Sequence, residues 1–318
     1  MTSSPRVVVS ASIAFDQIMS FNGSFADHIL AEKAHVLSVS FLIDSLKKHR
    51  GGVGGNIAWS LGLLGERSAL IGSVGEDFDE YRQALEEVGV DTSGVKVVPG
   101  EYTASGFLNA DMHGNQIVSF YPGAMSASRD IDLTAAANEA DYAIVGAHDP
   151  EGMMRHVREV AASRARLVFD PSQQIPILTG EQLAEGIELA DVVVANDYEY
   201  SMIGRKTDLS LDDIERKVEM TVVTYGDNGS EIRTGGERVH IPVAPLRGMV
   251  DPTGAGDAYR AGLIKGLLLG VDLDVVGRIA AQAATYPIEH YGTQEQRYTI
   301  DEFIERFEQS FPDYAGRL

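Results

Sequence analysis

Asp251-Pro252-Thr253-Gly254-Ala255-Gly256-Asp257 runs directly into the apolar, small-residue segment Ala258–Gly270. This pattern predicts a helix whose first N–H groups lie exposed at its start, where they can bind a phosphate. Glycines at 254 and 256 let that phosphate approach the backbone. Asp257 falls on the first turn, where the helix dipole favours an ionised carboxylate that can take a proton from an alcohol. A single Gly-x-Gly-Asp is equally typical of an ordinary helix start.

The composition argues against several classes of protein. With 47 acidic and 26 basic residues, the formal net charge is −21, which disfavours binding to nucleic acid or to an anionic membrane. A phosphorylated ligand must then be held locally, by backbone amides, a cation or a few basic groups. The absence of cysteine excludes disulfides, thiolate metal sites and cysteine nucleophiles. Because no apolar run is long enough for a membrane span and the N-terminus has no signal-peptide pattern, we expect a cytoplasmic protein.

Short β-branched runs alternate with helical segments along most of the chain. This alternation predicts a doubly wound, mostly parallel α/β sheet with helices on both faces. The runs expected to form its strands are 7–12, 68–75, 142–146, 167–170, 192–195 and 221–224, followed by a hairpin at 230–233 and 238–241. Helices are expected at 77–88, from 151, from 181, from 198, at 275–286 and at 300–310.

Two segments interrupt the alternation. One contains strand-like runs at 18–21 and 35–41, and the other contains a hairpin, 103–109 and 116–121, around a turn at 111–115. We pair them as a small β-sheet lid, from about 16–46 and 100–124, inserted into a single domain that spans 1–318. Asp16 is expected just beyond the first strand, at the edge where open α/β sheets bind ligands.

A second glycine turn, Gly51-Gly52-Val53-Gly54-Gly55-Asn56, opens another helical segment. Together with Ala58 and Gly65, this turn and residues 251–263 resemble the two signatures of the ribokinase-like (PfkB) carbohydrate and nucleoside kinases. The order of the elements extends the resemblance over nearly the whole chain. It implies a ribokinase-like fold with a small β-sheet lid, and transfer of the γ-phosphoryl group of ATP to an alcohol.

The resemblance also implies the roles of individual residues. Asp257 would be the catalytic base, beside an anion hole formed by the backbone of Gly254, Ala255 and Gly256, together with its own amide. The acceptor would contact Asp16, Gly52, Gly55 and Asn56. A carboxylate and an amide suit neighbouring hydroxyls of a ribose. Without the resemblance, Asp16 would be a turn residue at a strand end and Asn56 a helix cap.

The nucleotide side would use two further segments. Asn196 and Glu199 resemble the family's Asn-x-x-Glu element, in which Glu199 would act on Mg²⁺ through water, although a helix cap with an acidic first turn explains the same residues. The turn residues implied near the ATP phosphates and ribose are Thr224, Gly226 and Gly229. Many members add a monovalent cation such as K⁺, which would lie at Asp251, Thr253 and Gly292. Pro252 departs from the usual motif and biases Asp251 toward an extended backbone.

The acceptor is less strongly indicated than the reaction. The segments 120–125 and 283–294 look most like those of prokaryotic adenosine or nucleoside kinases, which act in purine salvage. Four aromatic side chains could enclose a base or simply pack the lid: Phe15, Phe41, Phe107 and Phe120. A sugar kinase of the ribokinase or fructokinase type and a catalytically silent sugar- or nucleotide-binding regulator are the alternatives. A dinucleotide-dependent dehydrogenase is disfavoured because no glycine fingerprint follows the first strand.

Three features are left open by the sequence. His113, at the expected hairpin tip, is best explained as a polar loop residue, and nothing in the spacing around His148 indicates a metal site. The partners expected are ATP and a small-molecule acceptor, with neither nucleic acid nor membrane, and the chain could be a monomer or a homodimer.

Overall fold

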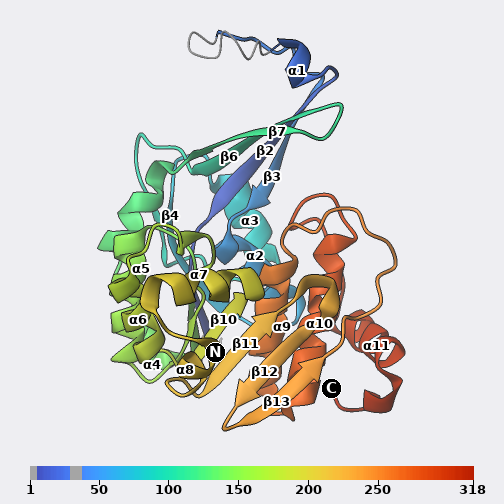
Figure 1. The fold of residues 1–318 in the computed structure, drawn as a ribbon. Coiled ribbons are helices and arrows are strands. Elements are labelled where there is room, and N and C mark those ends of the chain that lie inside the picture. The colour runs from blue at the N-terminus through green and yellow to red at the C-terminus, as the bar shows by residue number, and fades with distance from the viewer. Residues whose placement is uncertain (1–5, 29–37) are drawn as a thin grey trace.

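The computed structural model describes residues 6–28 and 38–318. A nine-stranded central sheet forms the body of the molecule (Figure 1). Its order is β13 (Glu237–Ile241), β12 (Ser230–Thr234), β11 (Met220–Thr224), β10 (Val192–Asn196), β9 (Arg166–Phe169), β8 (Tyr142–Val145), β1 (Val7–Ser10), β4 (Ser68–Val74) and β5 (Val95–Val97). The strands from β11 to β5 are parallel, and β12 and β13 add an antiparallel edge.

Helices cover both faces of this sheet. One face carries α2 (Val53–Leu63), α3 (Asp79–Glu87), α9 (Ala255–Leu269), α10 (Leu273–Ile288) and α11 (Ile300–Ser310). The other carries α4 (Thr134–Glu139), α5 (Pro150–Ala161), α6 (Gly180–Leu189), α7 (Asp197–Thr207) and α8 (Leu211–Glu215). Val7 and Val9 belong to the first core and Val8 to the second, because successive side chains of a strand point to opposite faces. The expected doubly wound fold is thus confirmed. In the described ranges, no helix combines the length and the apolar character that a bilayer crossing requires.

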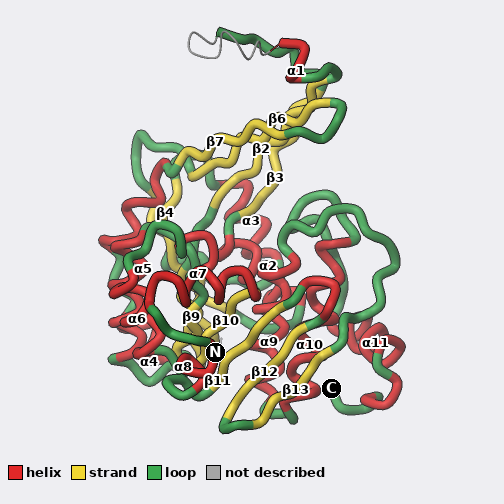
Figure 2. The backbone as a smooth tube through the Cα atoms, viewed as in Figure 1, coloured by secondary structure: helices red, strands yellow, loops and turns green. Residues whose placement is uncertain are grey.

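A second, four-stranded sheet projects from the body, at the top of Figure 1. Its order is β3 (Ser45–Gly51), β2 (Ala14–Phe21), β6 (Ala104–Asp111) and β7 (Gln116–Tyr121). We call it the lid sheet. Figure 2 shows its strands as a group separate from the central sheet, with α1 (Phe25–His28) at the far tip.

One strand of the lid sheet differs from the expectation. The run 35–41 was expected to be a strand, but 35–37 lie outside the described residues and 38–41 form no strand. Phe41 instead packs against Phe21 and Phe25, with ring centroids 5.1 and 4.9 Å apart. The strand that pairs with β2 is β3, which contains two lysines and an arginine and is mostly exposed. Its polar composition, typical of an edge strand, explains why an apolar pattern could not locate it.

Asp16 also lies elsewhere than expected. It is the third residue of β2, inside the lid sheet, where it pairs with His49 of β3 and Gly106 of β6. The first strand of the central sheet has already ended at Ser10. The carboxylate therefore belongs to the base of the lid sheet and not to the edge of the central sheet.

Helix α9 packs unusually closely against α10. A Cβ at Gly262 would lie 2.7 Å from the Cα of Ala280, and a Cβ at Gly266 would lie 2.8 Å from the Cα of Val276. Only glycine permits this approach, because a clash with backbone atoms cannot be relieved by turning a side chain. The contact fixes the position of α9, whose N-terminus carries residues 254–257.

We expect Gly266→Ala to lower the free energy of unfolding by about 1–2 kcal/mol, because overpacking against α10 outweighs the better helix propensity of alanine. Denaturant unfolding would measure the difference. Gly248→Ala is the control: nothing lies within 4 Å of its added methyl group, so its effect should stay within about 0.5 kcal/mol. Equal effects of the two substitutions would contradict the close-packing explanation.

Candidate active site

A cleft of about 890 Å³ lies between the central sheet and the lid sheet. It is lined by residues of both glycine turns: Gly52, Val53 and Asn56 from the first, and Thr253, Gly254, Gly256 and Asp257 from the second. Segments at the carboxyl ends of β1, β8, β9, β10 and β11 supply Ser12, Ala147, Ser172, Gln173, Asn196, Glu199 and Thr224. From the lid sheet come Asp16, Leu108, Val118 and Phe120. The two turns therefore share one cleft, at the edge where doubly wound sheets bind ligands.

The first turn is fixed against the loop that follows β1. Gly52 has φ +83°, and a Cβ there would lie 2.6 Å from both the Ser12 carbonyl oxygen and the Ala14 nitrogen. The Gly54 amide donates to the Ser12 carbonyl at 2.8 Å, and the Val53 amide donates to the Ser12 hydroxyl at 3.1 Å. These contacts place the N-terminus of α2 at the cleft.

Asp16 faces this turn from the lid sheet. Its Oδ2 lies 2.4 Å from the position that a Cβ of Gly51 would occupy, so the carboxyl group rests against the turn. Burial raises the pKa of Asp16, His49 opposes the rise and Asp251 adds to it. Gly55, by contrast, does not line the cleft. Its Cα faces the Tyr81 hydroxyl, which a Cβ would approach to 1.9 Å, so the absence of a side chain lets α2 pack closely against Tyr81.

The second turn presents free backbone donors. Gly254 is the N-cap of α9, with φ +83°. The Ala255 amide already donates to the Pro252 carbonyl at 3.3 Å, and the Ala258 amide donates to the Gly254 carbonyl at 3.0 Å. Among the described residues, the amides of Gly256 and Asp257 have no such backbone partner. These two amides are therefore free to bind an anion, whereas the Ala255 amide is already engaged within the turn.

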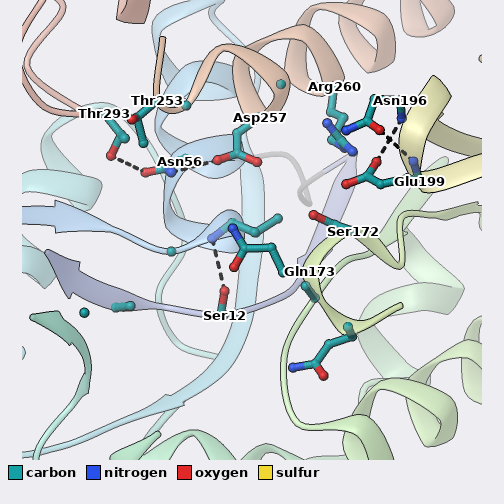
Figure 3. A pocket seen from close by; sticks show the side chains of 18 of the residues that line it. Ser12, Asn56, Ser172, Gln173, Asn196, Glu199, Thr253, Asp257, Arg260 and Thr293 are labelled. Carbon is teal, nitrogen blue, oxygen red and sulfur yellow. Dashed lines mark hydrogen bonds between the residues drawn. The ribbon is translucent and has the colours of Figure 1, made fainter. Parts of the chain in front are cut away.

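Asp257 is connected to the first turn by a hydrogen bond. The Asn56 Nδ2 donates to the Asp257 Oδ2 at 2.8 Å, although the two residues are 201 positions apart (Figure 3). The Asn56 Oδ1 in turn accepts from the Thr293 hydroxyl and from the Gln294 Nε2, both at 2.8 Å. These two donors fix the orientation of the Asn56 amide, so that its NH₂ group faces the carboxyl.

Burial raises the pKa of Asp257 to about 6, while the nearby Arg260 and the Asn56 hydrogen bond offset only part of that rise. The sequence suggested a carboxylate kept ionised by the helix dipole, but burial outweighs the dipole. A carboxyl with this pKa is suited to accept a proton near neutral pH.

Asn196 and Glu199 form a reciprocal cap at the start of α7. The Glu199 amide donates to the Asn196 Oδ1 at 2.7 Å, and the Asn196 amide donates to the Glu199 Oε2 at 2.8 Å. The capping explanation therefore holds, and both residues also line the cleft. In the described part of the chain there is no group of three or more His, Asp or Glu that could hold a metal ion.

A second cavity of about 570 Å³ adjoins the cleft. The two share Thr224, Gly226 and Gly256. Gly229 and Ala255 line the second cavity together with mostly apolar side chains: Val243, Ala244, Leu246, Met249, Tyr259, Ala281 and Ile288. The apolar walls of this cavity suit a flat apolar group. The three residues that it shares with the cleft suit a polar group.

Of the three residues considered for a monovalent cation, Asp251 and Thr253 lie together, whereas Gly292 does not line the cleft. The Asp251 Oδ1 accepts from the Thr253 amide at 2.9 Å, and Thr253 lines the cleft. Gly292, with φ +105°, lines neither cavity, and its Cα faces the His49 ring, whose Nδ1 a Cβ would approach to 2.6 Å. Its neighbour Thr293 does reach the second turn, since its Cβ is 3.0 Å from where a Cβ of Gly254 would lie.

Neither of the two histidines considered above, nor three of the four phenylalanines, is among the residues that line the cleft. The amide of His113 donates to Asp111 in the β6–β7 turn. The buried His148 lies 2.9 Å from the Gly146 carbonyl oxygen through its Nδ1, and burial lowers its pKa to about 4. Of the four aromatic candidates, Phe120 alone lines the cleft.

Several residues of the site had no sequence signal. Ser12 and Gln173 come from loops without a motif, and only the fold brings them to the cleft. Thr293, which lines the cleft, and Gln294, which donates to Asn56, belong to the segment 283–294, whose resemblance to nucleoside kinases did not indicate these contacts. Arg260 could have been noticed because it follows Asp257 by three positions on the same helix and so shares its face. Its partner Asp170 directly follows β9.

The chain is similar to one protein family and to several nucleoside kinases. Residues 16–299 match the family described as pfkB family carbohydrate kinase. A nucleoside kinase of Methanothermobacter thermautotrophicus is 34% identical over 275 residues, covering 85% of this chain and 88% of that protein. The structure of Burkholderia thailandensis nucleoside kinase in complex with inosine has a TM-score of 0.86 at 35% identity, over 96% of this chain and 98% of that one. The nucleoside kinase of Methanocaldococcus jannaschii, described as an archaeal member of the ribokinase family, has a TM-score of 0.85 at 27% identity, over 97% of this chain and 100% of that one.

Asp257→Asn should stabilise the protein at high pH. An aspartate with a pKa near 6 in the folded state favours folding below the ordinary pKa of the unfolded chain and loses that advantage as the pH rises through 6. Asparagine carries no charge to bury. We expect the variant to exceed the wild type in free energy of unfolding by about 1–2 kcal/mol at pH 8, since water in the cleft limits the effect, and the gain to disappear near pH 4. Denaturant unfolding across this range would test it, and a gain independent of pH would contradict the assignment.

Proposed function

This chain belongs to the pfkB family of carbohydrate kinases, and from that membership we propose that it transfers the γ-phosphoryl group of ATP to the 5′-hydroxyl of a nucleoside. The observation that carries the proposal is the position of Asp257. Its carboxyl lies in the same cleft as the first glycine turn and beside the two free amides of the second. A base and an anion-binding site in one cleft are the two parts that phosphoryl transfer to an alcohol requires.

The acceptor is proposed to lie under the lid sheet. Asp16 offers a carboxylate to the ribose hydroxyls, and Asn56 has a second N–H beside its bond to Asp257. Apolar side chains from the lid sheet and from the loops face the same cleft: Leu108, Val118, Phe120, Met125 and Ile177. These side chains provide an apolar surface for a nucleobase. A free sugar has no base to bury there. The names of the relatives agree, and we propose a purine nucleoside, with adenosine first and inosine next.

ATP is proposed to bind across the second cavity and the cleft. The adenine would occupy the apolar cavity beside Gly229 and Ala255, and the phosphates would pass Thr224 and Gly226 toward the amides of Gly256 and Asp257. Mg²⁺, bound mainly by phosphate and water, would neutralise charge on the phosphates, with Glu199 and Asn196 facing it through water. A K⁺ ion is proposed at Asp251 and Thr253.

The reaction then follows from the positions of these groups. The Asp257 carboxylate takes the proton of the acceptor hydroxyl, and the hydroxyl oxygen forms a bond to the γ-phosphorus. The bond from that phosphorus to the ADP oxygen breaks, and ADP leaves with the electron pair. The amides of Gly256 and Asp257 stabilise the charge on the transferred group. Positioning and charge stabilisation together account for the catalysis.

An acceptor screen would test the proposed function directly. The protein is incubated with ATP and Mg²⁺, with and without K⁺, and with adenosine, inosine, other nucleosides, ribose or fructose, while ADP release is followed. We expect at least one purine nucleoside to exceed every free sugar by about tenfold or more in kcat/KM, because burial of the base adds binding energy. If a free sugar is preferred, the nucleoside assignment is wrong and the kinase assignment stands. Absence of turnover with every acceptor would contradict both.

The pH dependence of the same reaction should reflect Asp257. Since only its ionised form accepts a proton, kcat/KM should rise from pH 5, pass an inflection near 6 and level off above 7. Asp257→Asn should lower kcat by at least ~10²-fold and remove the inflection, while binding of the nucleoside, measured by calorimetry, stays within a few fold. A rate that is unchanged between pH 5 and 8 would remove the role of Asp257 as base.

A further inference from the structure

Arg260 stands out among the described residues that line the cleft because no other lysine or arginine is present among them. The ionisable residues around it are acidic: Asp16, Asp197, Glu199 and Asp257. A triphosphate entering this cleft meets a protein with a formal net charge of −21. Phosphoryl transfer requires positive charge or directed donors near the transferred group. Arg260 is the side chain of the cleft that can supply both, since arginine remains protonated at any physiological pH.

The guanidinium of Arg260 is held rigidly from behind. Its Nη2 donates to the Asp170 Oδ1 at 2.6 Å, and its Nε lies 2.5 Å from the Asp170 Oδ2. Asp170 is fully buried and Arg260 is 7% exposed. The hydrogen bond and the close charged contact together hold the guanidinium against Asp170, and a lysine, with one charged nitrogen, could not make both.

The third nitrogen of the group points to the phosphate side. Nη1 lies 2.8 Å from the position that a Cβ of Gly256 would take, so the guanidinium lies over the turn that carries the free amides. In the part of the chain that the structure describes, Nη1 has no hydrogen-bond acceptor. Figure 3 shows Arg260 between Asp257 and the pair Asn196 and Glu199. The absence of a side chain at 256 therefore gives the guanidinium room as well as exposing the backbone.

We propose that the Arg260 Nη1 donates a hydrogen bond to the phosphoryl group during its transfer, and that Asp170 is the positioning residue that holds the guanidinium for this contact. The inference rests on the proposed kinase function and extends it. Asp170 neutralises much of the net charge of Arg260, so the contribution of the pair is a fixed, directed donor. Such donors stabilise developing charge without reorganisation, and the loss of one costs about 10²–10³-fold in rate.

A purely structural ion pair is the competing explanation. Buried ion pairs often contribute little net stability, and a neutral pair of similar size can replace them. The two explanations differ in what they predict for a variant that removes both charges and still folds. Removing Arg260 alone leaves Asp170 buried without a partner and could unfold the protein, so the double variant Arg260→Met/Asp170→Asn is the main test.

A matched control lies on the same helix. Lys265 pairs with Glu66 at 2.7 Å, both side chains are largely buried, and neither lines the cleft. Lys265→Met/Glu66→Gln removes an ion pair from α9 in the same way, without touching the site. Thermal unfolding of both double variants shows whether each is folded before its kinetics are measured.

We expect Arg260→Met/Asp170→Asn to lower kcat by about 10²–10³-fold, with the KM for the nucleoside changed less than about threefold, and the control to keep kcat within about twofold. Arg260→Lys should lose about tenfold or more, because it retains charge without the fork. In Arg260→Ala, added guanidinium at millimolar concentration should restore at least about tenfold of the lost rate. In the Arg260 variants the inflection of the pH profile should move to higher pH, since Arg260 opposes the rise in the pKa of Asp257.

The outcomes separate this inference from the proposed function. If the wild type phosphorylates a nucleoside and the folded Arg260→Met/Asp170→Asn variant keeps kcat within about fivefold, the role of Arg260 is wrong and the kinase function stands. If Arg260→Lys matches the wild type, the directed contact is wrong as well. If the wild type phosphorylates no acceptor, the proposed function fails and this inference fails with it.

Discussion

The hydrogen bond between Asn56 and Asp257 is the interaction on which the rest of the site depends. It joins the first turn of α2 to the first turn of α9, two helices whose N-termini meet although they are far apart in the sequence. The meeting requires Gly52 to touch the loop after β1, and it requires α9 to lie close against α10. Two separate packing constraints thus converge on one donor and one acceptor. They hold the first glycine turn, proposed to contact the acceptor, beside the second, proposed to contact the phosphates.

The strongly acidic character of the protein is compatible with the proposed phosphate site because the proposed donors are local. In the proposed arrangement, two backbone amides at the start of α9 and the Arg260 guanidinium, which is paired with Asp170, donate to the phosphates without making the cleft strongly positive. Backbone donors do not depend on the net charge of the surface. Burial works in the same direction for Asp257, since it keeps a proton acceptor available near neutral pH beside a site that must receive negative charge.

Much of the fold could be predicted from the sequence because its signals are local. Glycines before helices and β-branched runs before turns are readable from neighbouring residues, and most strands of the central sheet were found in this way. The strand β3 was missed because its residues are polar. Phe41 was expected in a strand, but it packs against aromatic side chains of other elements, and the sequence around it does not reveal these partners. The contacts that complete the site, from Thr293 and Gln294 to Asn56 and from Asp170 to Arg260, depend on tertiary packing that no spacing reveals.

The junction between β3 and α2 has a mechanical consequence. Gly51 is the last residue of the strand and Val53 the first of the helix, so Gly52 alone connects the lid sheet to the turn that carries Asn56. Because Gly52 is packed against the loop after β1, we expect it to have little freedom to turn, so that the end of β3 and the start of α2 would move together. The tip around α1, by contrast, lies at the opposite end of the lid sheet, and no residue of α1 lines the cleft, so we expect substitutions in α1 to leave the junction at Gly52 undisturbed.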